Sequence, residues 1–140
     1  MQKGAAASLF AAIKFPERVK GLIMIRPPTA WEERKERRRS LMEVADKCKV
    51  KNAESDKGYL VLQGATFSDL PHPDTDKSMY SGIKCPVLIL TVKGDATHPL
   101  STAYALTRAL PQATLHVAET KELAFSAWPS IIARFMREGL

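Results

Sequence analysis

Residues 85–99 read Cys-Pro-Val-Leu-Ile-Leu-Thr-Val-Lys-Gly-Asp-Ala-Thr-His-Pro, and this stretch decides the fold. From Pro86 to Val92 it is a continuous apolar run of strand length, rich in β-branched residues and bounded by proline and glycine. Such a run predicts a strand buried on both faces rather than a helix. Strands of that kind belong to parallel sheets covered by helices, so the sequence predicts an α/β fold.

Asp95 follows this strand after a sharp turn at Gly94, which places a carboxylate at the carboxyl end of a central strand. Chemistry collects at that end in open α/β sheets. Aspartate is also a common turn residue, so a cap of the turn or of the helix that Pro99 opens is a second interpretation. His98 could pair with Asp95 locally, whereas a turn histidine beside a proline is more often exposed.

The bulk composition indicates one globular domain of 140 residues, 45% of them hydrophobic. The net charge of +6 invites a nucleic-acid hypothesis. However, the charges concentrate in residues 31–51, where mixed signs at helical spacing indicate a solvated helix face. The sequence does not alternate aromatic and basic residues as single-strand binders do, so nucleic-acid binding is not expected.

Cys48 and Cys85 are the only cysteines and lie outside any CxxC or His/Cys cluster. A disulfide framework or a structural zinc site is therefore not expected. No cofactor is expected either. No apolar run is long enough to span a membrane. Residues 1–13 faintly mimic a signal peptide, but their apolar part is mostly alanine, which favours a buried helix. Without targeting signals or paired cysteines, a cytoplasmic location is expected.

The rest of the chain supplies the elements that surround the central strand. Gly4 to Lys14 has the small-residue surface of a helix packed on a sheet, and residues 19–25 form a second strand that Arg26-Pro27-Pro28 terminates. Residues 114–119 form the last strand. A closing helix over 128–136 places Ile131, Ile132, Phe135 and Met136 on its buried side. Crossovers of this kind feed a parallel sheet.

The segment Pro16-Glu17-Arg18-Val19, then Gly21-Leu22, after a small-residue helix and before a proline, resembles the segment that follows the nucleophile elbow of α/β-hydrolases. The resemblance implies the C-terminal half of that fold, with three parallel strands (19–25, 87–92 and 114–119). Its core would comprise residues 1–28 and 84–140. Residues 29–83 would form a helical cap, which either shapes a pocket for a small apolar or acyl substrate or is a cover without a ligand.

In this family the elbow reads G-x-S-x-G. The resemblance places the second glycine at Gly4 and the serine position at Gln2, which cannot act as that nucleophile. Asp95 matches the acid position, where an aspartate orients a histidine that acts as general base. The family's histidine would fall near Glu122 or Leu123, and residues 120–124 contain no histidine. An unconventional base such as His98 or His116 would then be needed. His98 is the candidate carried forward, because His116 lies inside a strand and is interpreted as structural.

Two functional hypotheses follow. The first is an ester, lactone or thioester hydrolase by resemblance, with this chain a truncated and catalytically impaired half. The second is a non-catalytic module that binds a small molecule or a protein. A third possibility concerns the strand at 19–25, which would be an exposed sheet edge. It predicts a homodimer, association with an N-terminal half, or poor solubility.

Overall fold

The computed structural model describes residues 4–27, 43 and 78–139. The chain divides into two units, residues 1–29 with 73–140 and residues 30–72. The second unit lies outside the described residues except for Glu43, so the cap at 29–83 stays a prediction. In order, the described elements are α1 (Gly4–Lys14), the 3-10 turn η1 (Pro16–Arg18), β1 (Leu22–Ile25), α4 (Ser78–Ser81), β2 (Val87–Val92), α5 (Leu100–Ala109), β3 (Ala113–Ala118) and α6 (Lys121–Glu138).

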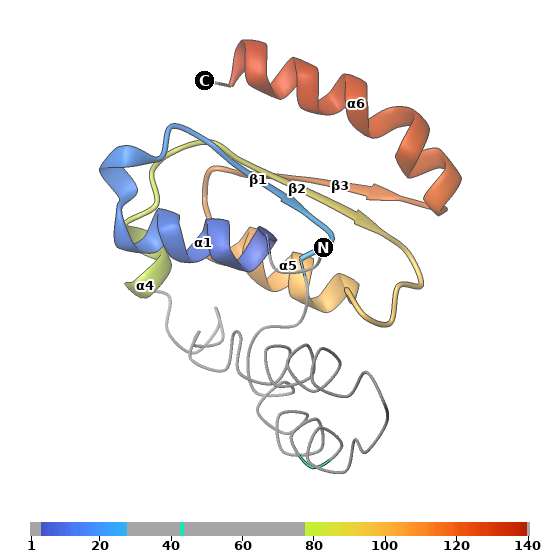
Figure 1. Ribbon diagram of the computed structural model, residues 1–140, viewed down its shortest axis with the longest axis horizontal. Coiled ribbons are helices and arrows are strands. Elements are labelled where there is room, and N and C mark those ends of the chain that lie inside the picture. Colours follow the sequence, from blue (N-terminus) through green and yellow to red (C-terminus); the bar gives the residue numbers. More distant parts are fainter. Residues whose placement is uncertain (1–3, 28–42, 44–77, 140) are drawn as a thin grey trace, which may run out of the picture. The chain divides into compact units, whose positions relative to one another are not determined.

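The three strands form one parallel sheet in the order β1-β2-β3, as the sequence predicts. Leu22 pairs with Val87, and Val87 pairs with Ala113. The central strand β2 is buried at every position, which explains why its sequence is apolar without alternation. Helix α6 packs on one face of the sheet, and α1 and α5 pack on the other (Figure 1).

The core on the α6 face is a cluster that the sheet and the helix build together. Leu88, Leu90 and Val92 of β2 pack against Ala124 and Trp128 of α6, with further aliphatic and aromatic side chains of the helix partly buried around them. Burying one such leucine side chain contributes about 2 kcal/mol to stability. This face therefore fixes α6 on the sheet.

The C-terminal helix differs from its prediction in two respects. It begins at Lys121 rather than at residue 128, because Thr120 caps it and accepts a hydrogen bond from the Leu123 backbone N–H (3.3 Å). Pro129, which suggested a helix start, lies inside the helix. Met136 is 57% exposed rather than buried, since Ala124, Trp128 and Phe135 mark the buried stripe and the residue after Phe135 turns out of it.

The outer strands are also shifted slightly from their predicted ranges. β1 begins at Leu22 because Val19 closes η1, its backbone N–H reaching the carbonyl of Pro16. β3 starts one residue earlier than predicted and ends at Ala118. These shifts leave the order and direction of the strands unchanged.

The connection after β2 turns at once toward α5. Gly94 adopts φ +71°, a backbone conformation that glycine takes without steric cost, which confirms the predicted sharp turn. Pro99 immediately precedes α5. Residues 95–98 are therefore held in a short loop at the carboxyl end of the sheet.

Candidate active site

Asp95 is anchored by the backbone of its own loop. Its Oδ1 accepts hydrogen bonds from the N–H groups of Thr97 (3.1 Å) and His98 (3.2 Å). An aspartate side chain that accepts hydrogen bonds from the backbone N–H groups two and three residues later stabilises a turn locally. The interpretation of Asp95 as a turn residue is thus correct, but it accounts for only one of the two carboxylate oxygens.

The second oxygen faces the His98 ring. Nδ1 of His98 lies 2.9 Å from Oδ2 of Asp95. The side chain of His98 is only 2% exposed, so the expectation of an exposed turn histidine is wrong. Bonding to a carboxylate favours the tautomer that carries the proton on Nδ1, which leaves Nε2 as the basic nitrogen. This is the geometry of an oriented general base.

Arg26 supplies a third group that sequence reasoning missed. It directly follows β1. Its Nε donates a hydrogen bond to Oδ2 of Asp95 at 2.7 Å, and its Nη2 forms an ion pair with the same oxygen. Its backbone takes φ +49°, and its N–H donates to the carbonyl of Leu90 (2.8 Å). The signal was a charged residue directly after a strand, because the carboxyl ends of adjacent parallel strands meet at one edge of the sheet.

These contacts set the ionisation of Asp95, whose side chain is 7% exposed. Burial alone would raise the pKa of this carboxyl group. The hydrogen bonds from His98 and Arg26 and the positive charges of these partners outweigh that effect and lower the pKa of Asp95 to about 2. The group is therefore a carboxylate throughout the neutral range, as an acid that stabilises a protonated histidine must be.

The other predicted site residues do not join this cluster in the described structure. Gly4 is the exposed first residue of α1, and Gln2 lies outside the described residues. Glu122 is in the first turn of α6. His116 lies within β3 in register with Leu90 of β2 and lines a separate cavity on the α6 side. Neither of the two described cavities includes Asp95 or His98.

Within residues 4–27 and 78–139, no group of three or more His, Cys, Asp or Glu side chains is placed to hold a metal ion. In the same part of the chain, no helix is both long and apolar enough to cross a membrane. Cys85 stands alone before β2, and burial raises the pKa of its thiol. The chemistry of the described site therefore depends on Arg26, Asp95 and His98.

Comparison with known proteins adds the fold relationship. No protein-family model and no curated protein matches the sequence. Solved structures do match, and they include esterases, a bromoperoxidase and an enol-lactonase of the α/β-hydrolase class. The chain has an α/β-hydrolase fold. It is a partial one, spanning less than two thirds of the length of the matched chains (61% for one of them).

Three of these α/β-hydrolase structures illustrate the match. The putative non-heme bromoperoxidase BpoC of Mycobacterium tuberculosis H37Rv aligns with 96% of this chain and 62% of its own, at 15% identity and a TM-score of 0.66. The enol-lactonase of Burkholderia xenovorans LB400 aligns with 99% of this chain and 64% of its own, at 14% identity and a TM-score of 0.59. A thermophilic esterase of Thermogutta terrifontis aligns with 96% of this chain and 60% of its own, at 20% identity and a TM-score of 0.58.

Proposed function

We propose that this chain is part of an α/β-hydrolase-like protein acting on esters, lactones or thioesters, with Asp95 as the acid and His98 as the base. One observation carries the proposal: the buried 2.9 Å contact between Asp95 Oδ2 and His98 Nδ1 at the carboxyl end of the central strand. The matched esterases and lactonase support the reaction class. His98 follows Asp95 by three residues within one loop, whereas the resemblance implies a histidine after the last strand.

The proposal includes a truncated and impaired catalyst. The serine position of the resemblance falls on Gln2, which offers no hydroxyl nucleophile. Loss of triad members typically lowers the rate by several orders of magnitude. Any turnover by this chain alone therefore depends on His98 activating a water molecule, and the limited coverage of the matched chains is consistent with a missing portion that carries the nucleophile.

The test is hydrolysis of p-nitrophenyl acetate by the wild-type chain, by Asp95→Asn and by His98→Gln. We expect slow wild-type turnover, and a loss of about tenfold or more in each variant, because general base catalysis contributes that much or more. Glu119→Gln, which removes an exposed carboxylate at the end of β3, is the matched control and should keep full activity. Unchanged activity in a folded Asp95→Asn protein would sink the proposal.

A non-catalytic binding module is the second candidate. It is favoured because both carboxylate oxygens of Asp95 already accept hydrogen bonds within the protein. Because Arg26 already neutralises Oδ2, the carboxylate is less available to stabilise a histidine cation during turnover. This candidate predicts that short acyl esters raise the melting temperature of the chain without being hydrolysed. Any turnover that Asp95→Ala abolishes would count against it.

A further inference from the structure

A cavity away from Asp95 lies on the face of the sheet that α6 covers, between α6 and the first half of β3. Its volume is about 190 Å³, and it opens to solvent. Its apolar lining comes from Leu88, which is 1% exposed, and from Ile131 and Phe135 of α6. Leu88 precedes Val92 by four residues, roughly 13 Å along the strand, so this cavity is separate from the Asp95 site.

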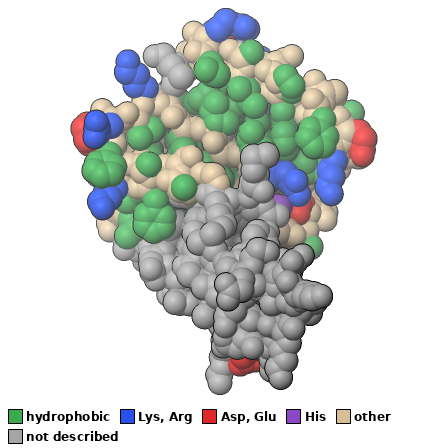
Figure 2. Space-filling model, in the orientation of Figure 1, with side chains coloured by type: hydrophobic (Ala, Val, Ile, Leu, Met, Phe, Trp, Pro, Cys, Tyr) green, Lys and Arg blue, Asp and Glu red, His purple; other side chains and the backbone are tan. Residues whose placement is uncertain are grey.

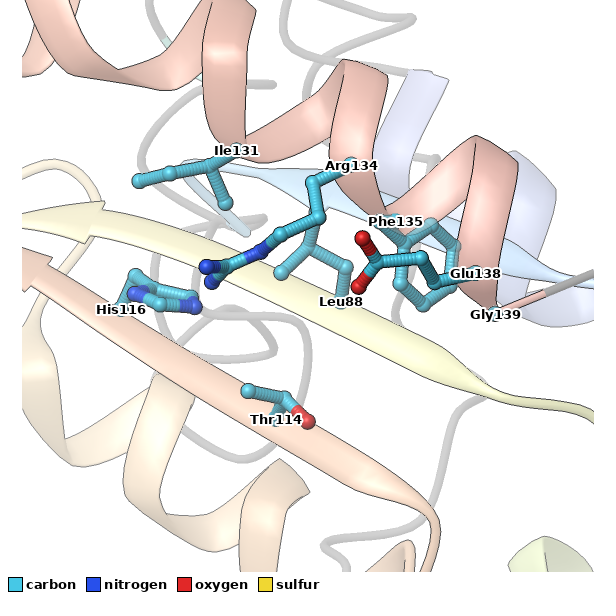
Figure 3. A pocket seen from close by; sticks show the side chains of 8 residues that line it. All are labelled: Leu88, Thr114, His116, Ile131, Arg134, Phe135, Glu138 and Gly139. Atoms are coloured by element: carbon cyan, nitrogen blue, oxygen red, sulfur yellow. The ribbon is translucent and has the colours of Figure 1, made fainter.

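The rim of this cavity is polar and carries two nitrogen donors. Thr114 and His116 approach from β3, and Arg134 extends its guanidinium across the opening toward β3 (Figure 3). In the part of the chain that the structure describes, the side chains of these three residues form no hydrogen bond or ion pair. Within residues 4–27 and 78–139, a guanidinium and an imidazole at the rim of a partly apolar cavity are therefore left without a side-chain partner.

We propose that this pocket binds a small organic carboxylate with an apolar body of about the size of benzoate. The carboxylate would accept hydrogen bonds from Arg134 and His116, since guanidinium–carboxylate bonds are among the stronger ones in proteins. The apolar body would lie against Leu88, Ile131 and Phe135. An apolar cavity of about 150 Å³ holds a benzene molecule, so 190 Å³ suits a ligand with one ring.

Glu138 gives the proposal a second test, because its negative charge would repel a carboxylate ligand. It lines the same cavity four residues after Arg134 on α6, yet the two side chains form no ion pair in the described structure. The order arginine then glutamate is the less favourable one for a pair at this spacing. A bound carboxylate would therefore be attracted by Arg134 and repelled by Glu138.

The experiment is a titration of the 15N-labelled chain with sodium benzoate, followed by NMR, with benzamide as the uncharged control ligand. We expect saturable shifts at the amides of His116, Ile131 and Gly139 with a dissociation constant on the order of 1 mM, as suits a ligand of few atoms. Benzamide should bind about tenfold more weakly, because it cannot form the charge-assisted bonds.

Three variants of α6 complete the design. Arg134→Gln should weaken benzoate binding about tenfold, whereas Glu138→Gln should strengthen it a few-fold by removing the repulsion. Arg137→Gln removes an equal charge from an exposed residue that does not line the cavity, and should leave binding within about twofold, because solvent and salt screen an exposed charge. Equal shifts with benzamide, or unchanged binding in Arg134→Gln, would overturn the proposal, as would the absence of saturable shifts with benzoate.

Discussion

Asp95 shows how one side chain can serve both a turn and a site. Oδ1 is used by the loop itself, through Thr97 and His98, while Oδ2 is shared between the His98 ring and Arg26. The local part of this arrangement could be predicted from residues 94–99. The contact with Arg26 could not, because it joins residues far apart in the sequence and depends on β1 lying beside β2. The burial of His98 also escaped prediction.

The pH dependence of stability follows from the lowered pKa of Asp95. Its folded value of about 2 lies below the ordinary 3.8, so the favourable contribution is full above pH 4 or so and is lost as the pH falls toward 2. The contribution is roughly 2 kcal/mol. Urea unfolding of the wild type and Asp95→Asn between about pH 5 and pH 2 measures it. The stability gap between the two proteins should close over that interval, and parallel curves would contradict this assignment.

Arg26 allows a separate test of its backbone conformation. With φ +49°, a residue that has a Cβ is disfavoured by about 1 kcal/mol or more relative to glycine. Arg26→Ala and Arg26→Gly both remove the ion pair with Asp95, so their difference isolates the backbone. We expect the glycine variant to have the larger free energy of unfolding by about 1 kcal/mol in urea.

The exposed position Ser126 within α6 is the matched control for this pair. There the order should be the usual one, with Ser126→Ala more stable than Ser126→Gly by about 1 kcal/mol. If alanine were favoured at both positions, Arg26 would not occupy the left-handed conformation.

At the scale of elements, the N-terminal cap of α6 at Thr120 can be tested by substitution. Thr120→Ala removes the oxygen that accepts from the Leu123 N–H, and we expect a loss of about 1 kcal/mol in the free energy of unfolding. Ser126→Ala on the same helix removes a hydroxyl that donates to the carbonyl of Leu123 within the helix, and should cost nothing. Chemical unfolding of both variants checks this, and equal effects would show that Thr120 is not a cap.

The elements themselves could be predicted to different degrees, for physical reasons. α1 and β2 were predicted with their observed bounds, because proline and glycine punctuate them sharply. The start of α6 was missed because Thr120 is a weaker sequence signal than Pro129, and tertiary packing carries the helix through that proline. Gln2 and, apart from Glu43, residues 29–77 of the predicted cap lie outside the described residues, so those predictions remain predictions.

For the molecule as a whole, the free edge of β1 matters most. The Leu22 N–H donates to the carbonyl of Pro86, directly before β2, and the Arg26 N–H donates to that of Leu90 in β2. Alternation therefore directs the N–H groups of Ile23 and Ile25 to the other side, where no described strand pairs with them. Ile25 is 45% exposed, Phe10 of α1 is 39% exposed, and Phe15, directly after α1, is 43% exposed. Figure 2 shows hydrophobic side chains gathered on the face that carries β1 and α1 in Figure 1.

We therefore predict that the chain self-associates through this edge. Ile25→Lys places a charge on the edge strand and should lower the association several-fold, because lysine there blocks strand pairing. Met136→Lys introduces the same charge at an exposed position of α6 and is the control. Sedimentation velocity over a range of concentrations measures the effect. A wild-type chain that stays a monomer at high concentration would refute the prediction.

The register of the sheet also has a kinetic consequence. Val87 meets Ala113 across a short α5 crossover, whereas Leu22 meets Val87 only after a much longer loop has closed. Closing a longer loop costs more chain entropy before its contacts form, so non-local pairings form later. The unit from β2 to α6 should assemble first and β1 should dock onto it last, carrying Arg26 with it. The ion pair that lowers the pKa of Asp95 would thus report the final step of folding.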